Sequence, residues 1–422
     1  MKKILSIMIA AALTAALTAH AFAAQPGLGN FTYTNTYIAG QFNDVRDTDW
    51  FSQYVEDAFN YGFLRGRSND MFDPHGLLTF GEAVTLAARL SSIYQTGKAD
   101  FPASTPFYEV YAEYALQHGI IESHGDYGAP ATRAQFAAIM HKALPTEAFP
   151  TINQIPGFGI PDVPTGTGIS EAVYALYRAG VLTGSDDFGT FFATSNISRA
   201  EASAVMVRLA DPGARVRMQL PSHIPAEAIF QRSANAVFKL EMFDDRGEPI
   251  RTGSGFFITE TGLAVTALHV LNFASSATIT MYNGDVYPVR GMRAYNEEHN
   301  LALIEIDSDK GGWSYLTLAD SDLIEVGNTV YAIGSPRNLL NSISEGVISH
   351  PSREVDGDTL IQFTAPISFG SGGGPVLNTL GQVIGVASSS YVQGQNLNLA
   401  IPVNFVKELE PGRLMTFMER FE

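Results

Sequence analysis

The chain repeats one two-helix pattern three times before residue 211, and this repeat constrains the fold more than any other feature. Each unit has a helix that ends at a glycine, a turn-rich loop and a second helix. The second helix starts with a capping box, in which a hydroxyl residue and an acid or amide three positions later satisfy free amides. One such unit cannot bury its apolar face alone, so we expect the three to pack together as an all-α module. The boxes are Thr79-x-x-Glu82, Thr132-x-x-Gln135 and Ser198-x-x-Glu201, in units over about 41–91, 101–145 and 158–211.

The N-terminus has the pattern of a secretory leader. Lys2 and Lys3 precede an apolar run to about residue 19, and Ala21-Phe22-Ala23 follows. This pattern predicts a signal peptide over residues 1–23, with 24–40 as the start of the exported chain. No later stretch of sequence is long and apolar enough to predict a membrane span.

Composition excludes several classes of function. Cysteine is absent, which excludes disulfides, thiolate metal sites and cysteine nucleophiles. The formal charge is −17, and charge of this sign repels nucleic acid and anionic lipid, so neither is an expected partner. The sequence indicates no cofactor and no metal.

The repeat resembles the S-layer homology (SLH) repeat, whose second helix starts with Thr-Arg-Ala-Glu. Units two and three keep this start closely, whereas Phe80 and Gly81 replace arginine and alanine in the first unit. The resemblance implies an exported protein on the surface of a bacterium, attached to an anionic, pyruvylated polysaccharide of the cell wall.

Two arginines are the candidate polysaccharide ligands. Arg133 and Arg199 occupy the first helical turn, where their charge adds to the positive end of the helix. Without the repeat context, both would be interpreted as solvated residues at helix starts. Phe80 cannot bind an anion, so we expect the groove of the first unit to be defective.

After Asp211 the chain changes character. Residues 212–228 are rich in proline and glycine and are the predicted linker. Short β-branched and aromatic segments separated by glycine turns then predict an all-β sandwich or barrel over residues 229–422. A closing helix is predicted over 403–419, with an interruption at Pro411-Gly412.

Six motifs in this second half stand in an order that resembles the HtrA/Deg branch of the trypsin-like serine proteases, over about residues 229–405. The resemblance implies a trypsin-like double β-barrel after the all-α SLH module, in one multidomain chain. The motifs are Gly253-Ser254-Gly255, Thr266-Ala267-Leu268-His269-Val270, Asn300-Leu301-Ala302-Leu303, Gly334-Ser335-Pro336, Gly370-Ser371-Gly372-Gly373-Gly374-Pro375 and Leu399-Ala400-Ile401-Pro402.

The resemblance identifies His269 as the general-base position, but the other two triad positions are replaced. Asn300 stands where the family has its aspartate, and Gly372 stands where it has its serine, three residues before Pro375. An asparagine can donate an amide hydrogen where an acceptor is needed, which favours the wrong tautomer of the histidine.

Nearby residues offer only imperfect substitutes. Glu297 and Glu298 precede Asn300 and could replace the missing acid only if the loop rearranged. Ser371 stands one residue before the nucleophile position, and a displacement near 1 Å already costs about a hundredfold in rate.

The sequence leaves three functions open. The preferred hypothesis is a wall-attached pseudoprotease that binds a peptide or unfolded protein, or acts as a surface scaffold. In it, the amides of Gly370 and Gly372 keep an oxyanion-hole turn, and strand edges pair with an extended peptide. The alternative is an active surface serine endopeptidase that uses Ser371 with His269. The third is a structural protein whose barrel is only a spacer.

Overall fold

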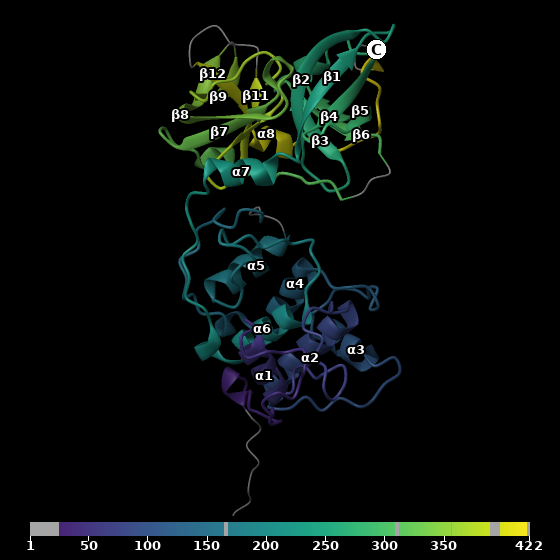
Figure 1. The fold of residues 1–422 in the computed structure, drawn as a ribbon, viewed down its shortest axis with the longest axis vertical. Helices are drawn as coiled ribbons and strands as arrows, with labels where there is room; N and C mark the ends of the chain where they lie inside the picture. The colour runs from purple at the N-terminus through teal and green to yellow at the C-terminus, as the bar shows by residue number, and fades with distance from the viewer. Residues whose placement is uncertain (1–24, 164–167, 309–311, 356, 389–396, 420–422) are drawn as a thin grey trace, which may run out of the picture.

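The computed structural model describes residues 25–163, 168–308, 312–355, 357–388 and 397–419. The predicted signal peptide over residues 1–23 lies outside the described residues. Figure 1 shows a helical part joined to a strand-rich part by a segment that leads into α7 (Ala226–Ser233). Within the described ranges, no helix is long and apolar enough to cross a bilayer.

The helical part contains three pairs of helices, one pair for each predicted repeat. In the second helix of each pair, the N-cap hydroxyl accepts from the third helical amide, and the side chain at that third position accepts from the cap amide. The three predicted capping boxes are therefore confirmed. The pairs are α1 (Ser52–Asn60) with α2 (Phe80–Thr96), α3 (Glu109–Gln117) with α4 (Arg133–Ala143), and α5 (Gly168–Arg178) with α6 (Arg199–Ala210).

A closed ring of backbone hydrogen bonds joins the three repeats. Leu78, Ala131 and Ile197 each stand directly before a capping residue. The Leu78 amide donates to the Ile197 carbonyl at 3.0 Å, and the Ile197 amide donates to the Ala131 carbonyl at 3.0 Å. The Ala131 amide closes the ring by donating to the Leu78 carbonyl at 2.8 Å. Because each repeat donates one of these hydrogen bonds to a second repeat and accepts one from the third, the module has approximate threefold symmetry.

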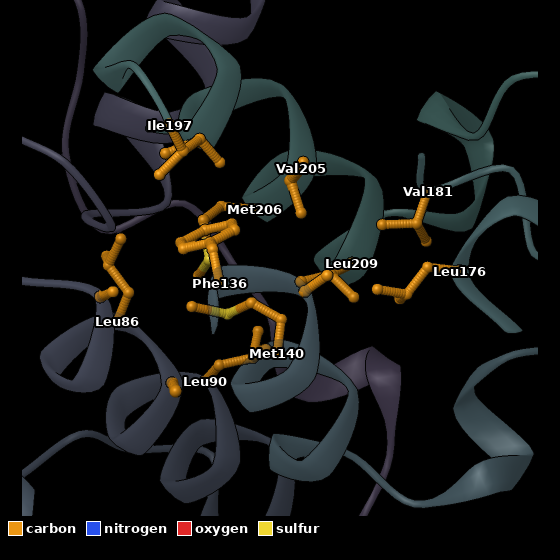
Figure 2. Packing of buried hydrophobic residues seen from close by; sticks show 14 of the residues in the cluster. Leu86, Leu90, Phe136, Met140, Leu176, Val181, Ile197, Val205, Met206 and Leu209 are labelled. Atoms are coloured by element: carbon orange, nitrogen blue, oxygen red, sulfur yellow. The ribbon is translucent and has the colours of Figure 1, made fainter. Parts of the chain in front are cut away.

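The second helices of the repeats fill the core between them. Figure 2 shows their apolar side chains pointing toward one another from three directions. Full burial of one such side chain contributes about 1.5–3 kcal/mol, so the shared core holds the repeats together. The residues are Leu86 and Leu90 of α2, Phe136 and Met140 of α4, and Met206 and Leu209 of α6, none more than 3% exposed.

The strand-rich part forms two closed antiparallel barrels of six strands each, with strand orders β1-β2-β3-β6-β5-β4 and β10-β11-β12-β9-β8-β7. The predicted double β-barrel is confirmed. The first barrel contains β1 (Val237–Phe243), β2 (Pro249–Phe257), β3 (Leu263–Ala267), β4 (Ser276–Met281), β5 (Val286–Asn296) and β6 (Leu301–Ile306). The second contains β7 (Thr329–Gly334), β8 (Ser342–Val355), β9 (Asp358–Phe363), β10 (Pro375–Leu377), β11 (Val383–Ser388) and β12 (Asn398–Pro402).

The closing helix predicted over 403–419 is wrong beyond its first turn. The observed helix, α8, covers only Asn404–Lys407. After it, the Gly412 amide donates to the Arg293 carbonyl at 2.7 Å, and Met415 pairs with Met292 of β5. These hydrogen bonds to the first barrel satisfy the backbone of the segment after α8, so the segment does not need helical hydrogen bonds.

The predicted linker also ends differently. It was expected to run to residue 228, but α7 starts at Ala226 and buries Ile229 in the core of the first barrel.

Gln382, in the turn between β10 and β11, joins the strand-rich part to the third repeat. Its side chain is fully buried. Its Nε2 lies 3.2 Å from the carbonyl oxygens of Phe158 and Ile160 and 3.3 Å from that of Pro161. These contacts hold the third repeat directly against the second barrel.

Candidate functional site

His269 and Asn300 meet at the ends of two paired strands. His269 lies on the turn η4 (Leu268–Leu271) that follows β3, and Asn300 directly precedes β6. Because β3 and β6 pair antiparallel, with Ala267 opposite Leu301, these ends are adjacent. The Nδ2 atom of Asn300 lies 2.8 Å from Nδ1 of His269, and the Oδ1 atom accepts from the His269 backbone amide at 2.8 Å.

These two contacts determine how the Asn300 amide faces the imidazole. Its Oδ1 already takes the backbone hydrogen of His269, so its NH₂ group faces Nδ1 and donates to it. Nδ1 is then an unprotonated acceptor, and the neutral ring carries its hydrogen on Nε2. Burial lowers the pKa of His269 below its ordinary value. The contact with Asn300 opposes this in part and nearby Arg251 adds to it, and the net lowering of the pKa favours the neutral ring at pH 7.

The backbone at Asn300 suits an asparagine or an aspartate. Its φ of 52° is left-handed, a conformation that these two residues tolerate better than other non-glycine residues. Its carbonyl accepts from the Leu268 amide at 2.9 Å, which fixes the loop. Glu297 and Glu298 are both exposed, and Nδ1 of His269 faces Asn300, so the loop has not rearranged toward either carboxylate.

Gly372, the predicted nucleophile position, has no hydroxyl, and the hydroxyl of the neighbouring Ser371 is turned inward. Gly372 is fixed by its carbonyl, which accepts from the Ser254 amide at 2.8 Å. Ser371 is only 5% exposed and packs against Gly334. Its Oγ accepts a long hydrogen bond, 3.4 Å, from the Ser368 amide. The Ser371 hydroxyl is therefore held within its own turn.

Two amides of this turn remain without an acceptor. Within the described part of the chain, neither the Gly370 nor the Gly372 amide donates a hydrogen bond. Gly370 has a φ of 95°, and a Cβ there would lie 2.5 Å from the Ser335 carbonyl oxygen, so only glycine fits. These amides belong to the two predicted oxyanion-hole residues.

Arg133 and Arg199 stand at the first position of α4 and α6, as predicted, but their side chains are buried between repeats. They are 8% and 3% exposed. Arg133 donates from Nε to the Phe191 carbonyl at 2.7 Å and pairs through Nη1 with Glu201. Arg199 donates from Nε to the Phe72 carbonyl at 3.0 Å. Each guanidinium also lies over the ring of the same phenylalanine, so both arginines tie one repeat to another.

The helix starts are occupied as well. In each second helix, the first two amides donate to carbonyls of a loop from another repeat, at 2.8–3.0 Å. An anion at a helix start would need these amides, so the expected anion site is not open there. The acceptors are Ala129 and Tyr127 for α2, Ser195 and Ala193 for α4, and Gly76 and Pro74 for α6.

The missing arginine of the first repeat is accompanied by a missing acid. Arg133, at the first position of α4, pairs with Glu201, at the third position of α6. Arg199, at the first position of α6, interacts electrostatically with Glu82, at the third position of α2, but Glu82 forms its ion pair with Arg67. The remaining two positions are held by Phe80 and Gln135, both uncharged. The capping boxes do not show that these acids also interact with arginines of another repeat. A signal for this was present in the sequence, because Phe80 and Gln135 both depart from the repeat pattern.

A groove of about 600 Å³ lies beside Arg133. It is lined by residues of all three repeats, and Arg199 is not one of them. Trp50 lines it and is 60% exposed, which is unusual for so large an apolar side chain. The charged side chains on its wall are Arg133, Arg208, Asp186, Asp187 and Glu201.

Two family models match the chain, one in each part. The S-layer homology domain matches residues 41–84 and 159–203, within the first and third repeats. The trypsin-like peptidase domain matches residues 253–386, across both barrels. The chain therefore carries S-layer homology repeats and a trypsin-like peptidase domain, which makes it a wall-associated, protease-like protein of the cell surface.

The relatives of the second part are HtrA- and DegP-type serine proteases. A probable periplasmic serine endoprotease DegP-like of Rhizobium meliloti (strain 1021) is 32% identical over 172 residues, which is 39% of this chain and 34% of that protein. Serine protease HTRA3 of Homo sapiens is 31% identical over 215 residues, 46% of this chain and 47% of that protein. A solved HtrA-type protease with tripeptide matches with a TM-score of 0.40 and 26% identity, over 44% of this chain and 62% of that one. The chain spans about a third to a half of the length of these curated relatives.

Proposed function

We propose that the trypsin-like part is a pseudoprotease that binds peptide without cleaving it, on a protein held at the cell wall by its repeats. The contact between Asn300 Nδ2 and His269 Nδ1 carries this proposal. A general base must accept the hydroxyl proton at Nε2 while Nδ1–H is held by an acceptor. Here Nδ1 faces a donor, so Nε2 already bears the hydrogen. Gly372 also offers no hydroxyl to attack a carbonyl.

The proposed binding activity uses what the site retains. A peptide carbonyl at the turn would accept from the Gly370 and Gly372 amides, as in an oxyanion hole. Strand edges near the site would pair with an extended peptide, and the missing side chain at Gly372 leaves room for it. An inert spacer would show no saturable binding of peptides, which distinguishes that third hypothesis.

A fluorophosphonate probe, which labels activated serines, is expected to leave the purified protein unlabelled. The reason is that Ser371 is 5% exposed and bonded within its turn, while His269 is held in the wrong tautomer. An active HtrA-type protease, labelled in parallel, is the control, and circular dichroism confirms folding. Label that disappears in Ser371→Ala would establish the endopeptidase alternative instead.

For the repeats, we propose that the groove beside Arg133 receives the wall polysaccharide. Trp50 supplies an exposed apolar face for a sugar ring, and Arg133 and Arg208 supply donors beside the carboxylates of Asp186, Asp187 and Glu201. Arg199 is proposed to act only indirectly, by holding α6 in place. This proposal retains Arg133 as a ligand residue and moves the site from the helix start to the groove.

Trp50→Ala is expected to weaken the affinity of the protein for purified wall sacculi about tenfold, measured by how much protein sediments with them. Trp50 is exposed, so its removal should leave the fold intact. The control is Phe107→Ala, which truncates another exposed aromatic residue, 53% exposed, outside the groove. Equal sedimentation of the two variants would show that the groove is not the wall site.

A further inference from the structure

A second cleft, of about 600 Å³, lies between the third repeat and the barrels. One wall is the loop over 186–194 of the third repeat, and the other consists of α7 and the loop over 312–317. The buried contacts of Gln382 hold the two parts together beside it. The cleft is thus a fixed feature of the joint; it shares only Asp186 with the groove beside Arg133 and no residue with the turn over 370–374.

Phe192 presents an aromatic ring to this cleft from a strained backbone. Its φ is 55°, a conformation that costs most side chains about 1–2 kcal/mol. The amides of Phe191 and Phe192 both donate to Asp162, and in the first repeat those of Phe72 and Asp73 donate to Asp44 in the same way. The first repeat therefore has an aspartate, Asp73, at this left-handed position. A phenylalanine that is 43% exposed has no packing reason to replace it.

Two further groups give the cleft a polar and aromatic wall. Tyr315 lines it from the opposite side and is 40% exposed. Arg232 of α7 donates from Nη2 to the Thr190 hydroxyl at 2.8 Å, and its guanidinium lies over the Phe188 ring. Its Nη1 is buried and has no partner within the described residues. A buried donor without an acceptor costs free energy, so an acceptor is what this cleft lacks.

The lining restricts the class of ligand. Three carboxylates, Asp162, Asp186 and Glu260, line the cleft with Arg232, and no other basic residue of the described chain does so. An anion is therefore disfavoured. The described lining residues belong to α7, loops and turns, so no strand edge is available to pair with an extended peptide. Exposed aromatic rings, hydroxyls and an unsatisfied donor suit an uncharged ring with apolar faces and a carbonyl acceptor.

We propose that this cleft is a second carbohydrate site, which binds an uncharged acetamido saccharide. Phe192 and Tyr315 would pack against the faces of the sugar ring, and the acetamido carbonyl would accept from Arg232. Because Nη1 is shielded from solvent, the loop over 186–194 would shift slightly from α7 as the ligand enters. The proposal does not depend on the pseudoprotease or on the groove beside Arg133.

The two tryptophans of the chain allow a direct test. Trp313 lines this cleft and Trp50 lines the other groove, so Trp50→Phe leaves Trp313, beside the proposed site, as the single tryptophan, which can be excited selectively. We expect tri-N-acetylchitotriose to change the Trp313 fluorescence saturably in this variant, and cellotriose, which lacks the acetamido groups, to bind at least about tenfold more weakly. No saturable change up to about 10 mM would overturn the proposal, as would equal binding of cellotriose.

Phe192→Asp, made in the same Trp50→Phe chain, separates binding from folding. It restores the residue type of the first repeat at the left-handed position, so the melting temperature should stay equal or rise while binding weakens by about tenfold or more. The matched control is Phe107→Asp, an exposed aromatic residue outside the cleft, which should bind normally. Unchanged binding in a folded Phe192→Asp variant would refute the assignment of this cleft.

Discussion

The double variant Gly372→Ser, Asn300→Asp is expected to become a serine protease that takes up a fluorophosphonate label and degrades an unfolded protein. Gly372 is not among the positive-φ glycines of the described chain, so a serine fits its backbone. Asn300 has a φ of 52°, which aspartate tolerates as well as asparagine. An aspartate there would accept from the His269 amide and from Nδ1–H, which moves the free lone pair to Nε2.

The single variants sharpen this expectation. Asn300→Asp alone should stay inactive because there is no nucleophile, and Gly372→Ser alone should be about 10⁴-fold slower than the double variant because the tautomer remains wrong. In Asn300→Asp the carboxylate should also raise the pKa of His269, which burial lowers in the native chain. A titration of His269 by NMR would detect this.

The control for the double variant is His269→Ala in the same background, which should abolish label. If the double variant is folded by circular dichroism yet takes up no label, the turn over 370–374 lacks the geometry of an oxyanion hole. In that case, the proposed peptide site at Gly370 and Gly372 would be wrong as well.

The repeat and the barrels could be predicted because their signals are local. A capping box needs only two side chains three residues apart, and Thr79, Thr132 and Ser198 each carry one. Alternating apolar residues and glycine turns likewise define short strands. The helix predicted over 403–419 was wrong because the backbone of this segment forms hydrogen bonds with Met292 and Arg293 of β5, which is distant in the sequence. Such a long-range partner leaves no local pattern.

The same distinction applies to the sites. The direction of the hydrogen bond between Asn300 and His269 could be predicted, since an asparagine amide has a donor that an aspartate lacks. The burial of Arg133 and Arg199 could not, since each is covered by a loop from another repeat. The cleft at Phe192 was also missed, because it exists only where the third repeat meets the barrels.

Arg133→Met is expected to lower the free energy of unfolding of the helical part by about 2–3 kcal/mol. Removing one partner of a buried pair costs about 3–5 kcal/mol, and we discount this because the Glu201 side chain is 29% exposed. The loss includes the hydrogen bond to the Phe191 carbonyl. At a few degrees per kcal/mol, the melting temperature of the helical part should fall by about 5–10 °C.

The partner variant Glu201→Gln turns this into a double-mutant cycle. Glutamine preserves the capping box, as Gln135 does natively in the second repeat, so the variant removes the charge without removing the cap. The equivalent positions of the first and second repeats hold the uncharged Phe80 and Gln135, so the module tolerates the absence of both charges. The double variant Arg133→Met, Glu201→Gln should therefore lose about 1–2 kcal/mol less unfolding free energy than the sum of the losses in the two single variants. Chemical denaturation followed by circular dichroism measures all four proteins. Strict additivity would mean that Arg133 and Glu201 stabilise the module separately, and the joint absence of charge at Phe80 and Gln135 would then have no energetic basis.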